Sequence, residues 1–135
     1  MKDRLKKKGA YLDKHVFYGL TNLNDGFDAM SIKYFSETDF KIVLDRVKEF
    51  GIGITGIEPW KEREWVGKII KINEVSFKVE KNIPRCVAIN LKPQSDDNSF
   101  NLLQLLKKIY GHFEMGIYLT ALDDGDINIG NSIDL

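Results

Sequence analysis

The stretch VGKIIKINEVSFKVEK, residues 66–81, carries the clearest secondary-structure pattern in the sequence. Apolar residues alternate with polar ones in its second half, the apolar positions being Val75, Phe77 and Val79. A period of two is typical of a β-strand with one buried face. Asn73 and Glu74 separate two extended runs, and asparagine favours turns. We therefore predict a β-hairpin whose turn lies at these two residues.

A helical pattern precedes the hairpin. Ser36 can cap residues 37–50, and Gly51 offers a C-terminal stop. Apolar residues recur between them at helical spacing, namely Phe40, Val43, Leu44, Val47 and Phe50. Extended runs lie on either side, FDAMSIKYF at 27–35 and IGITGI at 52–57. This region predicts a strand, a helix and a second strand.

The pattern after the hairpin is similar. The run RCVAINL, residues 85–91, is almost continuously apolar, as in a strand that is covered on both faces. Residues 100–113 carry a broad apolar stripe that predicts a second helix. Residues 115–122 form the last predicted strand.

This order predicts a two-layer α+β domain spanning residues 1–135, with a mainly antiparallel sheet and two helices whose apolar faces pack on it. A ferredoxin-like plan accommodates the order if the hairpin is inserted between its two halves. The two ends carry opposite charge. Residues 1–15 hold six basic residues against two acidic ones, and residues 123–135 are acidic with no basic residue. We interpret them as a solvated basic arm and a solvated acidic tail.

Composition is that of an ordinary globule, with 43% hydrophobic and 30% charged residues in 135. Twenty basic and twenty acidic residues cancel, which argues against nucleic acid or an anionic membrane as a partner. No apolar run is long enough to span a bilayer. The single cysteine, Cys86, lies in an apolar run, so we expect it to be buried. A cytoplasmic location fits these features.

Several motifs resemble ligand-binding patterns but lack the residues or the structural context that those patterns require. The glycines of GIGITG, residues 51–56, match a dinucleotide-binding pattern, but here a predicted helix precedes the motif and a strand follows it. The acidic segment 122–131 lacks the glycine and glutamate of a calcium loop. His15 and His112 have no partner at metal-ligand spacing, and His112 ends a predicted helix, where a cation is favoured. No cofactor or metal is expected.

The turn after residues 52–57 is the best candidate site. It holds two tryptophans around a run of alternating charges, and we assign partner binding to Glu58, Trp60, Lys61, Glu62, Arg63, Glu64 and Trp65. Tryptophan and arginine are enriched at the centres of protein interfaces. The alternative is that the tryptophans cover an edge of the core.

The segment FSETDFKIVLDRVKEFGIGITGIEPW, residues 35–60, resembles small bacterial immunity proteins of toxin-immunity systems of the contact-dependent growth inhibition type. The resemblance implies a cytoplasmic, non-catalytic protein that occludes the active site of a cognate toxin. Two other functions stay open. One is a small enzyme that uses surface carboxylates, and the other is a nucleic-acid-binding protein that uses the basic arm. The sequence does not determine the oligomeric state.

Overall fold

The computed structural model describes residues 5–6, 9–25, 51–85 and 102–135 of the chain. The elements in these ranges are, in chain order, β1 (Leu5–Lys6), β2 (Gly9–Leu12), β3 (Phe17–Asn22), β4 (Gly51–Ile54), the 3-10 helix η1 (Lys61–Trp65), β5 (Ile69–Ile72), β6 (Val75–Pro84), α2 (Leu102–Tyr110), β7 (Glu114–Ala121), β8 (Gly125–Asn128) and β9 (Ile133–Asp134). Strands dominate the described part, which is α+β with little helix.

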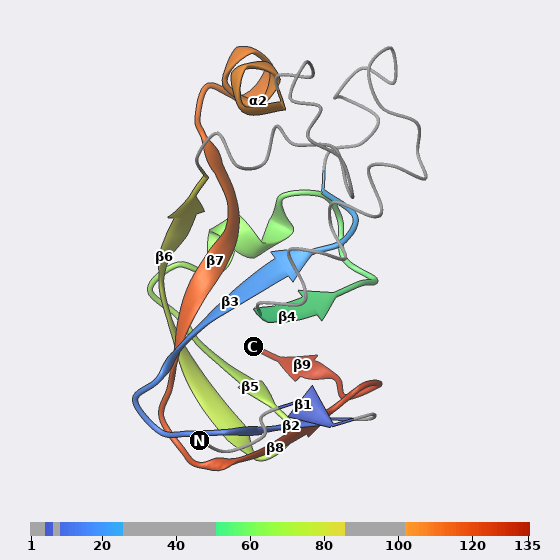
Figure 1. Cartoon of the computed structure of the whole chain (residues 1–135), viewed down its shortest axis with the longest axis vertical. Coiled ribbons are helices and arrows are strands. Elements are labelled where there is room, and N and C mark those ends of the chain that lie inside the picture. The colour runs from blue at the N-terminus through green and yellow to red at the C-terminus, as the bar shows by residue number, and fades with distance from the viewer. Residues whose placement is uncertain (1–4, 7–8, 26–50, 86–101) are drawn as a thin grey trace.

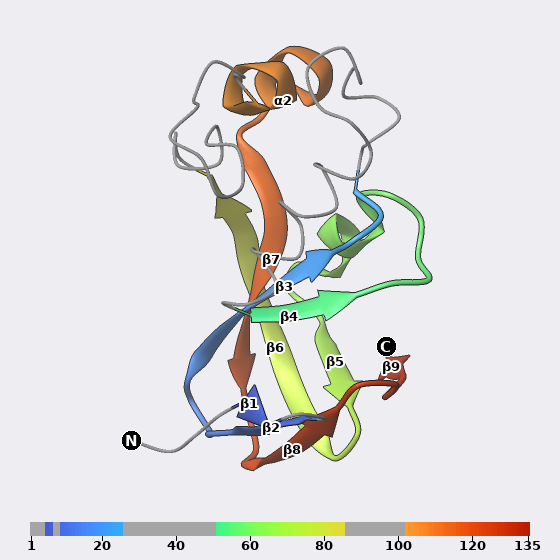
Figure 2. The ribbon, with the colours of Figure 1, turned by 45° about the vertical axis from the view of Figure 1, so that its right-hand side comes forward.

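Six strands form a curled mixed sheet in the order β4-β3-β7-β6-β5-β9 (Figures 1 and 2). β3 and β4 run parallel, whereas the other neighbouring strands of this sheet are antiparallel. The long strands β6 and β7 form its centre. The mainly antiparallel sheet that we predicted is therefore present, with one parallel pair at its edge.

The predicted hairpin is confirmed. β5 and β6 pair with Ile72 opposite Val75, which leaves Asn73 and Glu74 as the two-residue turn. Asn73 adopts a left-handed backbone with φ of 54°, which asparagine tolerates better than most residues. The alternating apolar side chains of β6, Val75, Phe77 and Val79, are fully buried.

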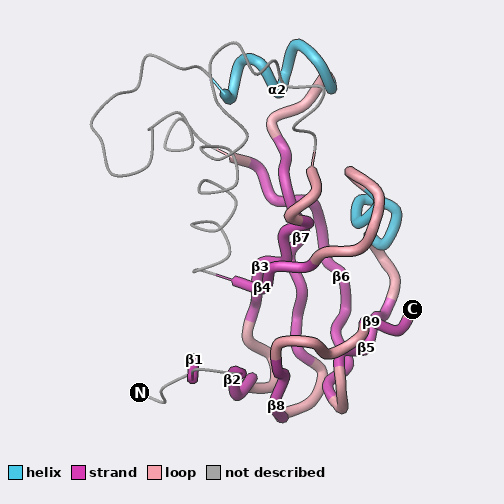
Figure 3. The backbone as a smooth tube through the Cα atoms, turned by 90° about the vertical axis from the view of Figure 1, so that its right-hand side faces the viewer, coloured by secondary structure: helices cyan, strands magenta, loops and turns pink. Residues whose placement is uncertain are grey.

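Both chain ends are part of the fold. β1, β2 and β8 form a second, three-stranded sheet, so residues from the basic arm pair with residues from the acidic tail. Figure 3 shows this small sheet across one end of the main sheet. Leu12 of β2 is only 2% exposed and joins the hydrophobic core, against which Ile127 of β8 also packs. Parts of both segments are therefore strands, while the charged side chains of Lys14, Asp124 and Asp126 are exposed.

The second layer differs from the prediction. One α-helix, α2, lies in the described part of the chain, and the helix predicted at 37–50 falls outside it. α2 lies beyond one end of the main sheet instead of covering its face (Figure 1). Leu106 is fully buried, whereas Ile109 and Phe113 from the predicted apolar stripe are 38% and 42% exposed. In the described residues, the small sheet contributes Leu12 to the core, and its Ile127 packs against that core.

Of the remaining predicted strands, some correspond to observed strands and others lie outside the described residues. The strand predicted at 52–57 corresponds to β4, and that at 115–122 corresponds to β7. Residues 27–35 and 86–91 lie outside the described residues, and so does the predicted burial of Cys86. The ferredoxin-like plan depended on those two strands. In the described part, the hairpin is not an insertion, because β6 pairs directly with β7 in the main sheet.

Candidate functional site at one end of the sheet

The turn that follows β4 divides its residues between surface and interior. Glu58, Lys61 and Glu64 are exposed, and Lys61 and Glu64 form an ion pair with Nζ and Oε2 2.6 Å apart. Glu62 and Trp65 are buried, at 0% and 4% exposure. Glu62 and Trp65 therefore do not belong to an exposed interface surface in this structure.

The two tryptophans have different environments. Trp65 belongs to the hydrophobic core, as the alternative interpretation of this turn required. Trp60 is half-buried, and its ring centroid lies 4.4 Å from that of Tyr110 and 5.8 Å from that of His112. Tilted and edge-on contacts at these distances are favourable between aromatic rings. Trp60 thus joins the turn to the segment at the end of α2.

A pair of buried carboxyl groups lies behind Trp60. Asp25, just after β3, and Glu62 of η1 are both completely buried. Asp25 Oδ1 accepts the backbone N–H of Trp60 at 2.8 Å, and Asn22 donates from Nδ2 to Glu62 Oε2 at 3.2 Å. Asn22 also donates to the carbonyl oxygen of Glu58 at 2.9 Å. These contacts fasten the turn to the end of β3.

Burial raises the pKa of the Asp25 carboxyl to about 9, and its hydrogen bond with the neighbouring Glu62 side chain and the negative charge of Glu62 act in the same direction. The Trp60 N–H and the charge of Arg63 oppose this shift. The protonated form of Asp25 is therefore favoured at neutral pH.

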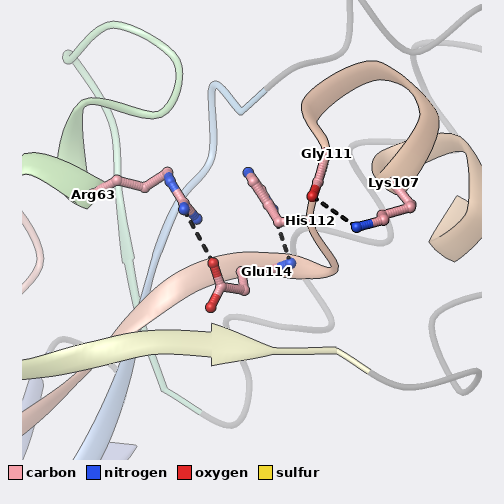
Figure 4. A network of polar contacts seen from close by, with 5 residues as sticks. All are labelled: Arg63, Lys107, Gly111, His112 and Glu114. Carbon is pink, nitrogen blue, oxygen red and sulfur yellow. Dashed lines mark hydrogen bonds and ion pairs between the residues drawn. The ribbon is translucent and has the colours of Figure 1, made fainter.

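A second group of charged side chains lies between η1 and β7 (Figure 4). Arg63 Nη2 donates to Glu114 Oε1 at 3.0 Å, and both side chains are about one-third exposed or less. His112 Nδ1 accepts the backbone N–H of Glu114 at 3.0 Å, so a neutral His112 carries its proton on Nε2. Figure 4 also shows Lys107, whose Nζ donates to the carbonyl oxygen of Gly111 at 3.0 Å.

The neutral form of the His112 ring is favoured. Burial lowers its pKa, and the positive charges of Arg63 and Lys107 add to that effect, whereas Glu114 opposes it. The end of the predicted helix favoured a cation here, whereas burial and the nearby cations lower the pKa of His112.

Arg85 completes the site at the end of β6. Its Nε donates to the carbonyl oxygen of Met115 at 2.9 Å, and its Nη2 lies 3.4 Å from Thr21 Oγ1. Gly116 makes this position possible, because a Cβ on Gly116 would lie 3.2 Å from Arg85 Nη2 and 2.8 Å from the Leu20 carbonyl oxygen. Arg85 therefore links β3, β6 and β7.

Unsatisfied polar atoms gather at this end of the molecule. Four buried side-chain atoms here have no hydrogen-bond partner, namely Asp25 Oδ2, Trp60 Nε1, Glu62 Oε1 and Arg63 Nη1. Buried polar atoms are nearly always paired, so such a group calls for a proton or a ligand that the contacts do not include. Only Asn82 Oδ1 shares this property elsewhere in the described residues.

The sequence pattern indicated one side of this site and not the other. Residues 58–65 were chosen, but Asn22, Asp25, Arg85, Tyr110 and Glu114 were not. The missed residues come from the ends of β3 and β6, the end of α2 and the start of β7. Only their packing in the folded chain brings them together. In the described ranges, no three histidine, cysteine, aspartate or glutamate side chains form a cluster that could hold a metal ion.

Comparison with known families decides where the chain belongs. Residues 44–134, well over half of its length, match the MOSC domain. This chain belongs to the MOSC family. The family is that of the C-terminal domain of molybdenum cofactor sulfurase, so the resemblance to toxin-immunity proteins was wrong, and with it the predicted function as a toxin inhibitor. The two alternatives, a carboxylate enzyme and a nucleic-acid-binding protein, do not match the family either.

No curated protein matches the chain. A helix with the length and apolarity needed to cross a bilayer is absent from the residues described above. The MOSC match begins at residue 44, so β3, Asn22 and Asp25 precede it, whereas Glu62, Arg63 and Arg85 lie within it. The site therefore combines side chains from both parts of the chain.

Proposed function

We propose that this MOSC domain binds the molybdenum cofactor at the end of the sheet where β3, η1, β6 and β7 meet. The family match over residues 44–134 carries this proposal. The site geometry supports it, because unpaired buried donors and aromatic rings lie together at one place. When bound, the cofactor supplies redox and sulfur chemistry at its metal centre, and the chain supplies the binding site.

The residues present fit the organic part of such a cofactor, which is a flat, polar pterin with an anionic phosphate. Trp60 Nε1 and Arg63 Nη1 are buried donors that have no partner. Trp60, Tyr110 and His112 form an aromatic group, in which the Tyr110 and His112 rings are stacked with centroids 6.1 Å apart. An aromatic face can stack on a heterocycle, and an arginine suits an anionic oxygen.

Once the proton on Asp25 is counted, the charges at this end of the sheet sum to zero, so no net negative charge opposes an anionic ligand. Arg63 and Glu114 neutralise each other, while a protonated Asp25 leaves the acid pair with one negative charge instead of two. Arg85 adds a positive charge at the end of β6. Arg63, Trp60 and Arg85 are the residues that would hold the pterin and its phosphate.

A sulfur-carrying role is the second candidate, and Cys86 favours it. Cys86 is the single cysteine of the chain and follows Arg85 directly in sequence. A sulfur carrier needs a thiolate that can be converted to a persulfide, and cysteine is the residue that supplies one. The placement of Cys86 itself lies outside the described residues.

One set of purified proteins tests both functions. The wild-type chain and the variants Arg63→Ala, Cys86→Ser and Lys61→Ala are produced in cells that make molybdenum cofactor. Molybdenum is measured by mass spectrometry, pterin by fluorescence after oxidation, and sulfane sulfur by cyanolysis. If the chain binds the cofactor, Lys61→Ala should contain as much molybdenum and as much pterin as wild type. Lys61 is an exposed residue of the same turn. Arg63→Ala should lose most of both.

The outcomes separate the two roles. Sulfane sulfur that disappears only in Cys86→Ser, without molybdenum or pterin, would support sulfur carriage and reject cofactor binding. Absence of molybdenum, pterin and sulfane sulfur from folded wild-type protein would contradict both.

A further inference from the structure

The buried carboxyl groups of Asp25 and Glu62 form a unit of their own. Both side chains are at 0% exposure, and each has one oxygen without a donor, Oδ2 of Asp25 and Oε1 of Glu62. Two carboxylates side by side in a protein interior repel each other strongly, because little water is available to screen them. Both groups cannot be charged in this arrangement without a large energetic cost.

The hydrogen-bond partners show where a proton belongs. The second oxygen of each carboxyl is occupied, since Asp25 Oδ1 accepts from the Trp60 N–H and Glu62 Oε2 accepts from Asn22 Nδ2. A proton placed between the two unpaired oxygens would let these side chains hydrogen-bond each other, because a carboxylate alone is only an acceptor. That proton accounts for both unpaired oxygens.

We propose that Asp25 and Glu62 share one proton at neutral pH, and that this acid pair is a pH-sensitive clamp that holds Trp60 and Arg63 against the end of β3. The proposal goes beyond cofactor binding and does not depend on it. It assigns Asp25, which lies outside the MOSC match, the role of a positioning residue for side chains within the match.

The clamp acts through the backbone of Trp60. This residue has a left-handed conformation with φ of 65°, which is unfavourable for a tryptophan and persists only when its surroundings hold it. Asp25 Oδ1 supplies that restraint by accepting the Trp60 N–H. Arg63 follows in the next turn, where its own N–H donates to the Trp60 carbonyl oxygen at 3.2 Å. Repulsion between charged Asp25 and Glu62 side chains would therefore displace the side chains of Trp60 and Arg63.

The other charged groups at this end do not replace the shared proton. Arg63 lowers the pKa of Asp25, but this is the smallest of the contributions, and its guanidinium is paired with Glu114 of β7. His112 faces Arg63 and favours its neutral form. The Glu58 side chain is exposed, and Arg85 is bound to the Met115 carbonyl oxygen.

The pH dependence has a definite sign. Burial raises the pKa of Asp25 to about 9, from a value near 4 in an unfolded chain. The native state therefore binds one more proton than the unfolded state in this interval. The stabilisation is fully present below about pH 4 and is lost as the pH rises through about 9.

The first experiment compares wild type with Asp25→Asn by chemical denaturation between pH 5 and pH 9. One shared proton makes the unfolding constant of wild type rise by up to about tenfold per pH unit relative to a chain that lacks it. Asparagine keeps the acceptor for Trp60 and can donate to Glu62, so Asp25→Asn should fold and lose this tenfold dependence. Glu74→Gln, an exposed residue of the β5–β6 turn, is the matched control and should keep the wild-type slope. Equal slopes in all three proteins would overturn the proposal.

The second experiment observes the proton directly, and it remains informative if Asp25→Asn does not fold. Difference infrared spectra of wild type at neutral pH and above pH 9 should contain the C=O band of a buried protonated carboxyl that disappears at the higher pH. The indole N–H resonance of Trp60, assigned with Trp60→Phe, should shift in the same pH interval. Absence of that band at neutral pH would show two ionised carboxylates and overturn the proposal, whatever the cofactor content of the protein.

Discussion

The ring centroid of Trp60 lies 4.4 Å from that of Tyr110, with the ring planes inclined at 56°. This contact joins the turn after β4 to the last residue of α2, two segments that have no strand pairing with each other. The helix has only one fully buried side chain among those described, Leu106. The aromatic contact is therefore a second described interaction, beside Leu106, that holds the end of α2 over the site.

We predict that Trp60 and Tyr110 are energetically coupled. A double-mutant cycle with Trp60→Ala and Tyr110→Ala should give a coupling free energy of about 0.5 to 1.5 kcal/mol, the range for an aromatic pair. Unfolding in urea measures the four proteins of the cycle. The exposed Ile129 provides a control, because Trp60→Ala and Ile129→Ala should be additive. Coupling of the same size in the control cycle would show that the effect does not come from this contact.

The charge on Arg63 should control the protonation of His112. Arg63 lowers the pKa of His112 through its positive charge, so Arg63→Gln should raise that pKa. Glu114 acts in the opposite direction, and Glu114→Gln should lower it further. Both changes are measured by NMR titration of the His112 ring, with the exposed His15 signal as a reference in the same sample. An unchanged pKa in both variants would mean that burial alone sets it.

Sequence pattern predicted the local parts of this fold and missed the parts that depend on distant pairing. The β5–β6 hairpin follows from alternation and from Asn73 alone. β1 and β2 were hidden because lysines dominate the composition around them, although Leu12 reaches the core. The pairing of β2 with β8 joins segments near the two ends of the sequence, and no local pattern encodes such a pairing.

The site shows the same limit. The run from Trp60 to Trp65 was found because tryptophans and alternating charges are conspicuous in a sequence. Asp25 was missed because an aspartate in a polar stretch is usually exposed, and only the fold places it beside Glu62. The immunity-protein resemblance relied on a helix-and-strand layout at residues 35–60, and such a layout occurs in many unrelated folds. Layout alone therefore did not identify the family.

Among the α2 side chains that the structure describes, Leu106 should contribute most to stability. Leu106→Ala removes a fully buried side chain and should cost about 2 to 5 kcal/mol of unfolding free energy. Ile109→Ala on the same helix removes a side chain that is 38% exposed, and its cost should be clearly smaller. Denaturation in urea measures both variants. Equal costs would mean that the two faces of α2 are equally buried.

Gly116 offers a test of how tightly β3, β6 and β7 meet beneath the site. It has φ of 87°, and a Cβ there would lie 2.8 Å from the Leu20 carbonyl oxygen, 3.0 Å from Thr21 Oγ1 and 3.2 Å from Arg85 Nη2. Gly116→Ala therefore adds a backbone clash to the cost of a left-handed alanine, which by itself is about 1 to 3 kcal/mol.

Gly130 separates these two effects. It has φ of 97°, and no atom lies within 4 Å of the position that its Cβ would take, so Gly130→Ala should carry the conformational cost alone. We expect Gly116→Ala to be the less stable variant in urea denaturation and to shift the NMR signal of the Arg85 side chain, which Gly130→Ala should leave in place. If the two variants lost the same stability and the Arg85 signal did not move, the close approach at Gly116 would have no energetic consequence, and Arg85 would not depend on a glycine at that position.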